Sequence, residues 1–130
     1  MDGYLEMADK LPWERMLKCC IWSHEPFGDC GMERISQLFG DEYLATRSGE
    51  KLCEITSAGA SKGWAARRIA ELVGAHTLVC VGDYENDVTL LQAADISYAV
   101  GNAMPKLKQI ADRVTVTNKE DAIAAIIAEL

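Results

Sequence analysis

The stretch "VGDYENDVTLL" at residues 81–91 places Asp83, Glu85, Asn86 and Asp87 directly after a short apolar run. That run, "TLVCV" at residues 77–81, is rich in β-branched residues and is followed by Gly82, a pattern that predicts a buried strand. Acidic and amide groups gathered at one point repel one another and resist desolvation, so a compensating partner is expected. A metal ion is one such partner, and a solvated turn is the alternative.

Length and composition limit the classes of protein that this chain can represent. Its 130 residues suffice for one domain with a core of ordinary size. The net charge of −7 argues against binding to nucleic acid or to an anionic membrane through a general electrostatic patch. No apolar run approaches the about 20 residues that a membrane-spanning helix needs. The first ten residues lack the basic region and apolar core of a secretory signal.

The cysteines indicate the redox environment. There are five of them, an odd number without a CxxC pair, which favours reduced thiols and a cytoplasmic location. Cys53 and Cys80 lie inside apolar runs and are predicted to be small core residues. A zinc site that uses His24 and Cys30 is conceivable, but Pro26 and the neighbouring glycines favour a loop there.

The second half of the sequence alternates between helical and strand patterns. Strands separated by single helices imply parallel pairing with right-handed crossovers. The pattern predicts helices at residues 61–74, 86–95, 106–112 and 119–130, and strands at residues 77–81, 96–100 and 113–117.

The first half has a different order of elements. A strand, a helix and a hairpin that turns at Gly49 suggest a small mixed α+β unit. Residues 1–15 carry little pattern and are predicted to be a linker or a frayed start. The three elements are predicted at residues 16–22, 31–40 and 42–57.

Topology brings several polar residues to one edge of the predicted sheet. Open parallel sheets bind ligands outside the carboxyl ends of their strands, where Asp83 lies. A helix of about 13 residues rises about 20 Å and a strand of about 5 residues returns about 16 Å, so Lys62 is expected at the same edge. Asn86 and Asp87 begin the next helix, whose free N–H groups favour phosphate. The turn at residues 100–105 emerges there too.

An ammonium group close to a magnesium-binding carboxylate is the pairing that a phosphoryl-transfer site needs. A purely structural interpretation stays open at this point. In it, Asp83 begins an Asx turn, Asn86 is a helix N-cap and Lys62 is a solvated surface residue.

The motif "GDYENDVTLL", with "SKG" before it and "AVGNA" after it, resembles the haloacid dehalogenase (HAD) superfamily in its Cof-type, type IIB-capped phosphatase branch. The resemblance covers residues 58–130 in order and spacing, and more loosely extends to residues 16–57. It implies an α/β fold: the C-terminal half of a Rossmann-like parallel-sheet core, preceded by part of an α+β cap domain.

The resemblance also implies roles for individual residues. Lys62 is the third-motif lysine that holds the nucleophile and the phosphoryl group of a phosphorylated small molecule. Asp83 ligates Mg²⁺, Asn86 contacts the phosphate, and Asp87 supports the coordination of the metal. Glu85 occupies a variable position and is expected to be solvated.

The nucleophile of the family is an aspartate in a DxD pair after an N-terminal apolar strand. Asp2, Asp9 and Asp29 do not fit this pattern, so only the C-terminal portion of such an enzyme is represented. With one anchoring carboxylate left for the ion, Mg²⁺ binding is expected to be weak. The leading hypothesis is a truncated Mg²⁺-dependent phosphomonoester hydrolase that is inactive alone.

Two other hypotheses remain. One is a non-catalytic phosphate-binding or regulatory module, and the other is a structural, self-associating fragment. In the resembled fold, the nucleophile's strand lies beside the strand at residues 77–81. Without that neighbour the strand has an unpaired apolar edge, so we expect a homodimer or association with the missing half of the core.

Overall fold

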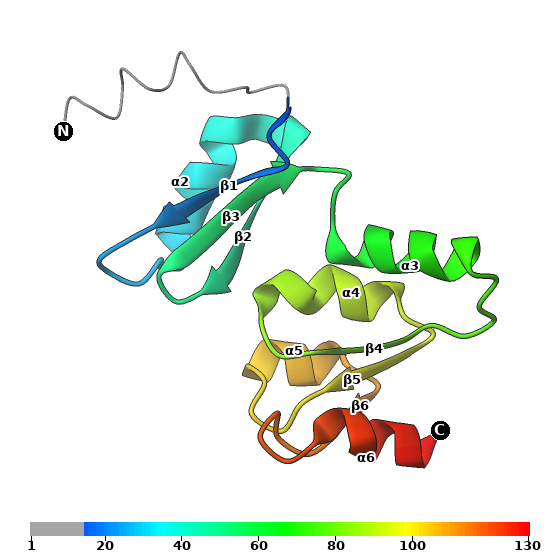
Figure 1. The fold of residues 1–130 in the computed structure, drawn as a ribbon. Helices are drawn as coiled ribbons and strands as arrows, with labels where there is room; N and C mark the ends of the chain where they lie inside the picture. The colour runs from blue at the N-terminus through cyan, green and yellow to red at the C-terminus, as the bar shows by residue number, and fades with distance from the viewer. Residues whose placement is uncertain (1–14) are drawn as a thin grey trace.

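The computed structural model describes residues 15–130, which form two three-stranded sheets with helices packed on them (Figure 1). The N-terminal sheet is antiparallel, in the order β1-β3-β2, and α2 packs against β2. Its elements are β1 (Lys18–Trp22), α2 (Asp29–Phe39), the 3₁₀ turn η3 (Gly40–Glu42), β2 (Tyr43–Gly49) and β3 (Leu52–Ser57).

The C-terminal sheet is parallel, in the order β4-β5-β6. Figure 1 shows α3 and α4 on one side of this sheet and α6 on the other. Within residues 15–130, no helix is long and apolar enough to cross a membrane. The elements are α3 (Lys62–Leu72), β4 (Val79–Gly82), the 3₁₀ turn η4 (Glu85–Asp87), α4 (Val88–Ala93), β5 (Ile96–Ala99), α5 (Pro105–Ile110), β6 (Arg113–Val114) and α6 (Ala122–Glu129).

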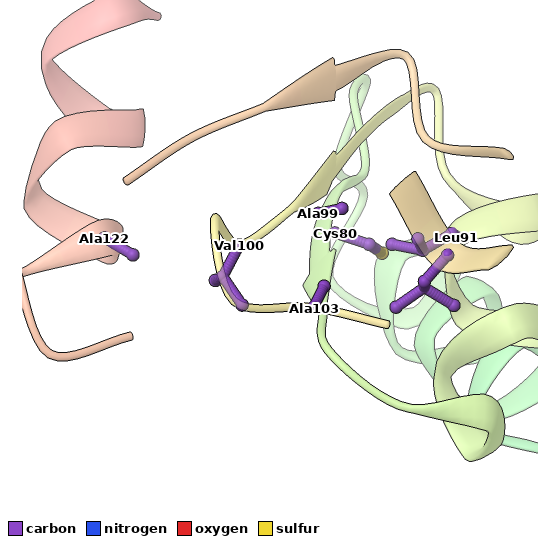
Figure 2. Close-up of a cluster of buried hydrophobic side chains, with 7 residues drawn as sticks. Cys80, Leu91, Ala99, Val100, Ala103 and Ala122 are labelled. Atoms are coloured by element: carbon purple, nitrogen blue, oxygen red, sulfur yellow. The ribbon is translucent and has the colours of Figure 1, made fainter. Parts of the chain in front are cut away.

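The predicted fold class is confirmed, because a parallel α/β sheet follows a small α+β unit. A cluster of buried apolar side chains joins β4, β5 and their helices (Figure 2). The two cysteines predicted to be core residues are buried, with Cys53 0% exposed in β3 and Cys80 6% exposed in β4. The cluster consists of Cys80, Leu91, Ala99, Val100, Ala103, Leu107 and Ala122.

Several elements are shorter than the sequence pattern predicts. The strand predicted at residues 113–117 pairs as a strand only at Arg113–Val114. The chain then turns at residues 117–120, where Glu120 accepts hydrogen bonds from the backbone N–H and hydroxyl of Thr117. The helix predicted from residue 119 begins only at Ala122, because Asp121 has the left-handed φ of 54°.

The remaining boundaries differ by a few residues. The helix predicted at residues 86–95 begins as the 3₁₀ turn η4 and ends at Ala93. The loop expected around His24 ends where α2 begins at Asp29, so Cys30 lies in a helix. The predicted linker at residues 1–15 falls outside the described part of the chain, except for Arg15.

Asp112 ties β5 to the start of β6. One of its carboxylate oxygens accepts hydrogen bonds from the backbone N–H of Ser97 at 2.8 Å and from the Ser97 hydroxyl at 2.7 Å. The Ser97 hydroxyl in turn accepts from the Asp112 N–H at 3.0 Å. The bonds from the hydroxyl and the backbone of Ser97 hold the pKa of Asp112 below its ordinary value.

A carboxylate whose pKa is lower in the folded state stabilises the protein above its unfolded pKa of about 4. This stabilisation disappears as the pH falls through the lower, folded-state pKa. We therefore expect Asp112→Asn to reduce Tm more at neutral pH than near pH 2, as measured by circular dichroism. Asp41→Asn, on an exposed residue, is the control. An equal loss of Tm at both pH values contradicts the prediction.

Candidate active site

Three of the predicted site residues lie between the end of β4 and the start of α4. Asp83 follows Gly82, the last residue of β4, and is exposed. Asn86 and Asp87 belong to η4, which continues directly into α4. Asp87 is only 5% exposed, so its carboxylate needs compensation within the protein.

Lys62 supplies part of that compensation. It is the first residue of α3, whose N-cap Ser61 accepts a hydrogen bond from the Trp64 N–H at 3.1 Å. The Lys62 ammonium donates to Oδ1 of Asp87. Lys62 therefore lies at the carboxyl edge of the sheet, as the topology predicts.

The second carboxylate oxygen of Asp87 faces the backbone. Oδ2 accepts hydrogen bonds from the N–H groups of Asp83 at 3.0 Å and of Tyr84 at 3.4 Å. Burial by itself raises the pKa of Asp87, but the hydrogen bonds from Lys62 and from this backbone outweigh it, so the pKa lies below its ordinary value. Asp87 is thus a carboxylate held ionised by its surroundings.

Two glycines allow this close approach. A Cβ at Gly63 would overlap the carbonyl oxygen of Thr89, so the starts of α3 and α4 can touch only because this residue has no side chain. A Cβ at Gly82 would lie 2.5 Å from Cβ of Asp87 and 2.9 Å from its Oδ2. The absence of a side chain at both positions leaves room for Lys62 and Asp87 to come within hydrogen-bonding distance of each other.

Asp83 and Asn86 are less constrained. Within residues 15–130, the structure shows no hydrogen bond to either side chain. The backbone of Asp83 is fixed, because its carbonyl oxygen accepts from the Met104 N–H at 3.0 Å. That bond brings the predicted third turn, residues 100–105, to the same edge. A cavity of about 630 Å³ opens there, lined by Asp83 and Asp87 and, from α6, by Ile123 and Ile127.

The donor set limits what metal could bind. No group of three or more His, Cys, Asp or Glu side chains is arranged to hold a metal within residues 15–130. Both oxygens of Asp87 already accept hydrogen bonds, which leaves Asp83 and Asp121 as the cavity-lining carboxylates that accept none from residues 15–130. Mg²⁺ commonly binds through one or two carboxylates, with water and substrate phosphate as its other ligands. The residues present therefore fit Mg²⁺ only with such additional ligands.

The expectation that Glu85 is solvated is wrong. Its carboxylate, 17% exposed, accepts hydrogen bonds from Nε of Arg47 at 2.6 Å and from Nη2 at 2.8 Å. Arg47 lies 38 positions earlier, in β2 of the other sheet. The sequence carries no periodic signal for such a pair, since neither residue belongs to a motif that includes the other.

A lysine at the start of a crossover helix and a pair of aspartates after a parallel strand lie where open α/β sheets bind their ligands. The family model for haloacid dehalogenase-like hydrolases matches residues 6–127, and the chain belongs to this family. The resemblance to its Cof-type phosphatases is thereby confirmed.

The relatives include phosphatases of Bacillus subtilis. Phosphatase YwpJ is 40% identical over 92 residues, which cover 69% of this chain and 32% of YwpJ. The 5-amino-6-(5-phospho-D-ribitylamino)uracil phosphatase YitU is 35% identical over 78 residues, or 58% of this chain and 29% of YitU. A solved structure, a haloacid dehalogenase-like hydrolase from B. subtilis, superposes with a TM-score of 0.76 at 32% identity, covering 88% of this chain and 40% of that chain. The chain spans about a third of the length of these two curated relatives.

Gly82→Ala tests the packing beneath Asp87. The added methyl group must displace the Asp87 side chain, so we expect a loss of about 1–3 kcal/mol in the free energy of unfolding. Denaturant titration measures it. Gly59→Ala is the matched control, because a Cβ there meets nothing within 4 Å. Equal stability of the two variants would show that the close approach at Gly82 is unimportant.

Proposed function

We propose that residues 58–130 are the part of a phosphatase core that holds the phosphate and Mg²⁺, and that residues 16–57 are part of its cap. The observation that carries this proposal is the contact of Lys62 with the buried Asp87 beside the exposed Asp83. The substrate class is a phosphomonoester of a sugar or small metabolite, as in the family's phosphatases.

Each residue has a distinct role in this proposal. Half of the Lys62 side chain is exposed, so its ammonium can donate to a phosphoryl oxygen while it remains bonded to Asp87. Asn86 offers its side-chain amide to the same group. Asp83 anchors Mg²⁺, and Asp87 fixes Lys62 and the backbone of Asp83. The ion, when bound, neutralises negative charge on the phosphoryl oxygens.

We do not propose turnover by these 130 residues, because the sequence contains no DxD pair to supply the attacking carboxylate. We propose instead that the chain, taken alone, binds phosphate and Mg²⁺ weakly without hydrolysis. A cytoplasmic location belongs to the same proposal and is supported by five cysteines that are all unpaired.

Titration calorimetry with inorganic phosphate and Mg²⁺ tests the binding. We expect Lys62→Met and Asp83→Asn each to weaken binding at least tenfold, or about 1.4 kcal/mol. Arg68→Ala is the control, because Arg68 lies on the exposed part of α3 and pairs with Glu71. The wild-type chain should show no Mg²⁺-dependent hydrolysis of p-nitrophenyl phosphate. A robust rate that Asp83→Ala abolishes would overturn the proposal and require another nucleophile.

The alternative role, self-association, has its own support in the C-terminal sheet. Among the described strands, β4 pairs only with β5, so its other edge is unpaired. Apolar side chains flank that edge: Val79 and Val81 are partly exposed, and Ile69 and Ile127 are at least 60% exposed. An unpaired apolar edge is a template for another chain. We therefore propose a homodimer that forms through β4.

Size-exclusion chromatography with light scattering tests this association. We expect a dimer at micromolar concentration and a shift toward monomer in Val81→Lys, because a charge at the edge opposes strand pairing. Leu38→Lys, at an exposed position of α2, is the control and should leave the dimer intact. A well-folded wild-type monomer would contradict the proposal.

A further inference from the structure

The strand β2 is irregular where it carries Arg47. Arg47 lies opposite Cys53 and Gly49 lies opposite Leu52, so Ser48 is an extra residue in the ladder, as in a β-bulge. The Ser48 hydroxyl is buried and has no hydrogen-bond partner within residues 15–130. Bulges redirect side chains and are frequent beside functional sites. Here the irregularity occurs where β2 packs against η4.

The Arg47 guanidinium joins three segments. It donates two hydrogen bonds to Glu85 of η4, one from Nη1 to the carbonyl oxygen of Phe27 at 2.7 Å, and one from Nη2 to Asp29 at 2.7 Å. The segment at residues 23–28 is itself attached to the β2–β3 turn, since the Phe27 N–H donates to the Glu50 carbonyl oxygen at 2.7 Å.

The Arg47–Glu85 contact, here called the inter-sheet pair, differs from an ordinary surface ion pair. Both side chains are at most 20% exposed, and both hydrogen bonds of the fork are short. Two-point contacts between arginine and carboxylate fix orientation as well as distance. Exposed single-point pairs contribute little by comparison.

The inter-sheet pair is also the one hydrogen-bonded side-chain contact that we find between residues 15–57 and residues 61–130. Figure 1 shows the β2–β3 hairpin beside the start of α4, where η4 lies. Glu85 immediately precedes Asn86 and is two residues before Asp87. A displacement of Glu85 by the N-terminal sheet would therefore also displace the turn that carries the candidate phosphate-binding residues.

We propose that the inter-sheet pair fixes the orientation of the N-terminal sheet relative to the C-terminal sheet and holds η4 in the conformation that presents Asn86 and Asp87. Arg47 is thus a positioning residue that acts through Glu85. This inference concerns orientation and local order, so it does not require that the chain binds phosphate. Its failure and the failure of the proposed function can be told apart.

Residual dipolar couplings and amide hydrogen exchange, both measured by NMR on the full chain, test the inference. For the wild-type chain, we expect one alignment tensor to fit both sheets. For Arg47→Lys, which keeps the charge but loses the fork, and for Glu85→Gln, we expect two different tensors. We also expect exchange of the η4 and α4 amides to rise at least tenfold, while exchange in β3 and β5 stays unchanged.

Lys18→Met is the matched control, because Lys18 pairs with Glu54 at 2.9 Å within the N-terminal sheet. It should leave both the shared tensor and the η4 exchange unchanged. The double variant Arg47→Lys/Glu85→Gln should be no worse than either of these single changes, since each of them already breaks the fork between the two side chains. The inference is wrong if one tensor still fits both sheets in Arg47→Lys and Glu85→Gln with η4 exchange unaltered, or if Lys18→Met produces the same changes.

Discussion

The contact between the Lys62 ammonium and the buried carboxylate of Asp87 is the constraint on which the candidate site depends. A carboxylate that is 5% exposed is costly to bury unless it is paired and hydrogen-bonded. Lys62 and two backbone N–H groups satisfy Asp87, and these same bonds fix the backbone at Asp83. The electrostatic requirement of one side chain therefore fixes the backbone at Asp83 and Tyr84.

This contact in turn limits the packing of the helices. Lys62 can reach Asp87 only if the starts of α3 and α4 come very close, which requires a residue without Cβ at Gly63. Gly82 meets the same requirement beneath the Asp87 side chain. Replacing either glycine would force a change of backbone or rotamer in a region where several hydrogen bonds depend on position. The glycines are thus part of the site, although they offer no functional group.

Much of the C-terminal sheet could be predicted because its signals are local. Buried parallel strands read as short apolar runs, and the helices between them show their apolar faces by periodicity. The ends of these elements could not be predicted, since they depend on particular contacts such as Thr117 with Glu120 and on the left-handed backbone of Asp121. The pairing of Glu85 with Arg47 could not be predicted either. It joins the bulge of β2 to η4, and these two segments are far apart in the sequence.

The three acidic residues after β4 lie in three different environments. These environments explain how the cluster can exist although like charges repel one another. Asp87 is neutralised by Lys62, and Glu85 by Arg47. Of these three, only Asp83 has a carboxylate that accepts no hydrogen bond from residues 15–130, and it lines the cavity at the edge of the sheet together with Asp121. Because its two acidic neighbours are already compensated, the remaining negative charge of this turn lies on Asp83. A cation bound there meets the free carboxylate of Asp83, and Asp121 at the start of α6 lines the same cavity.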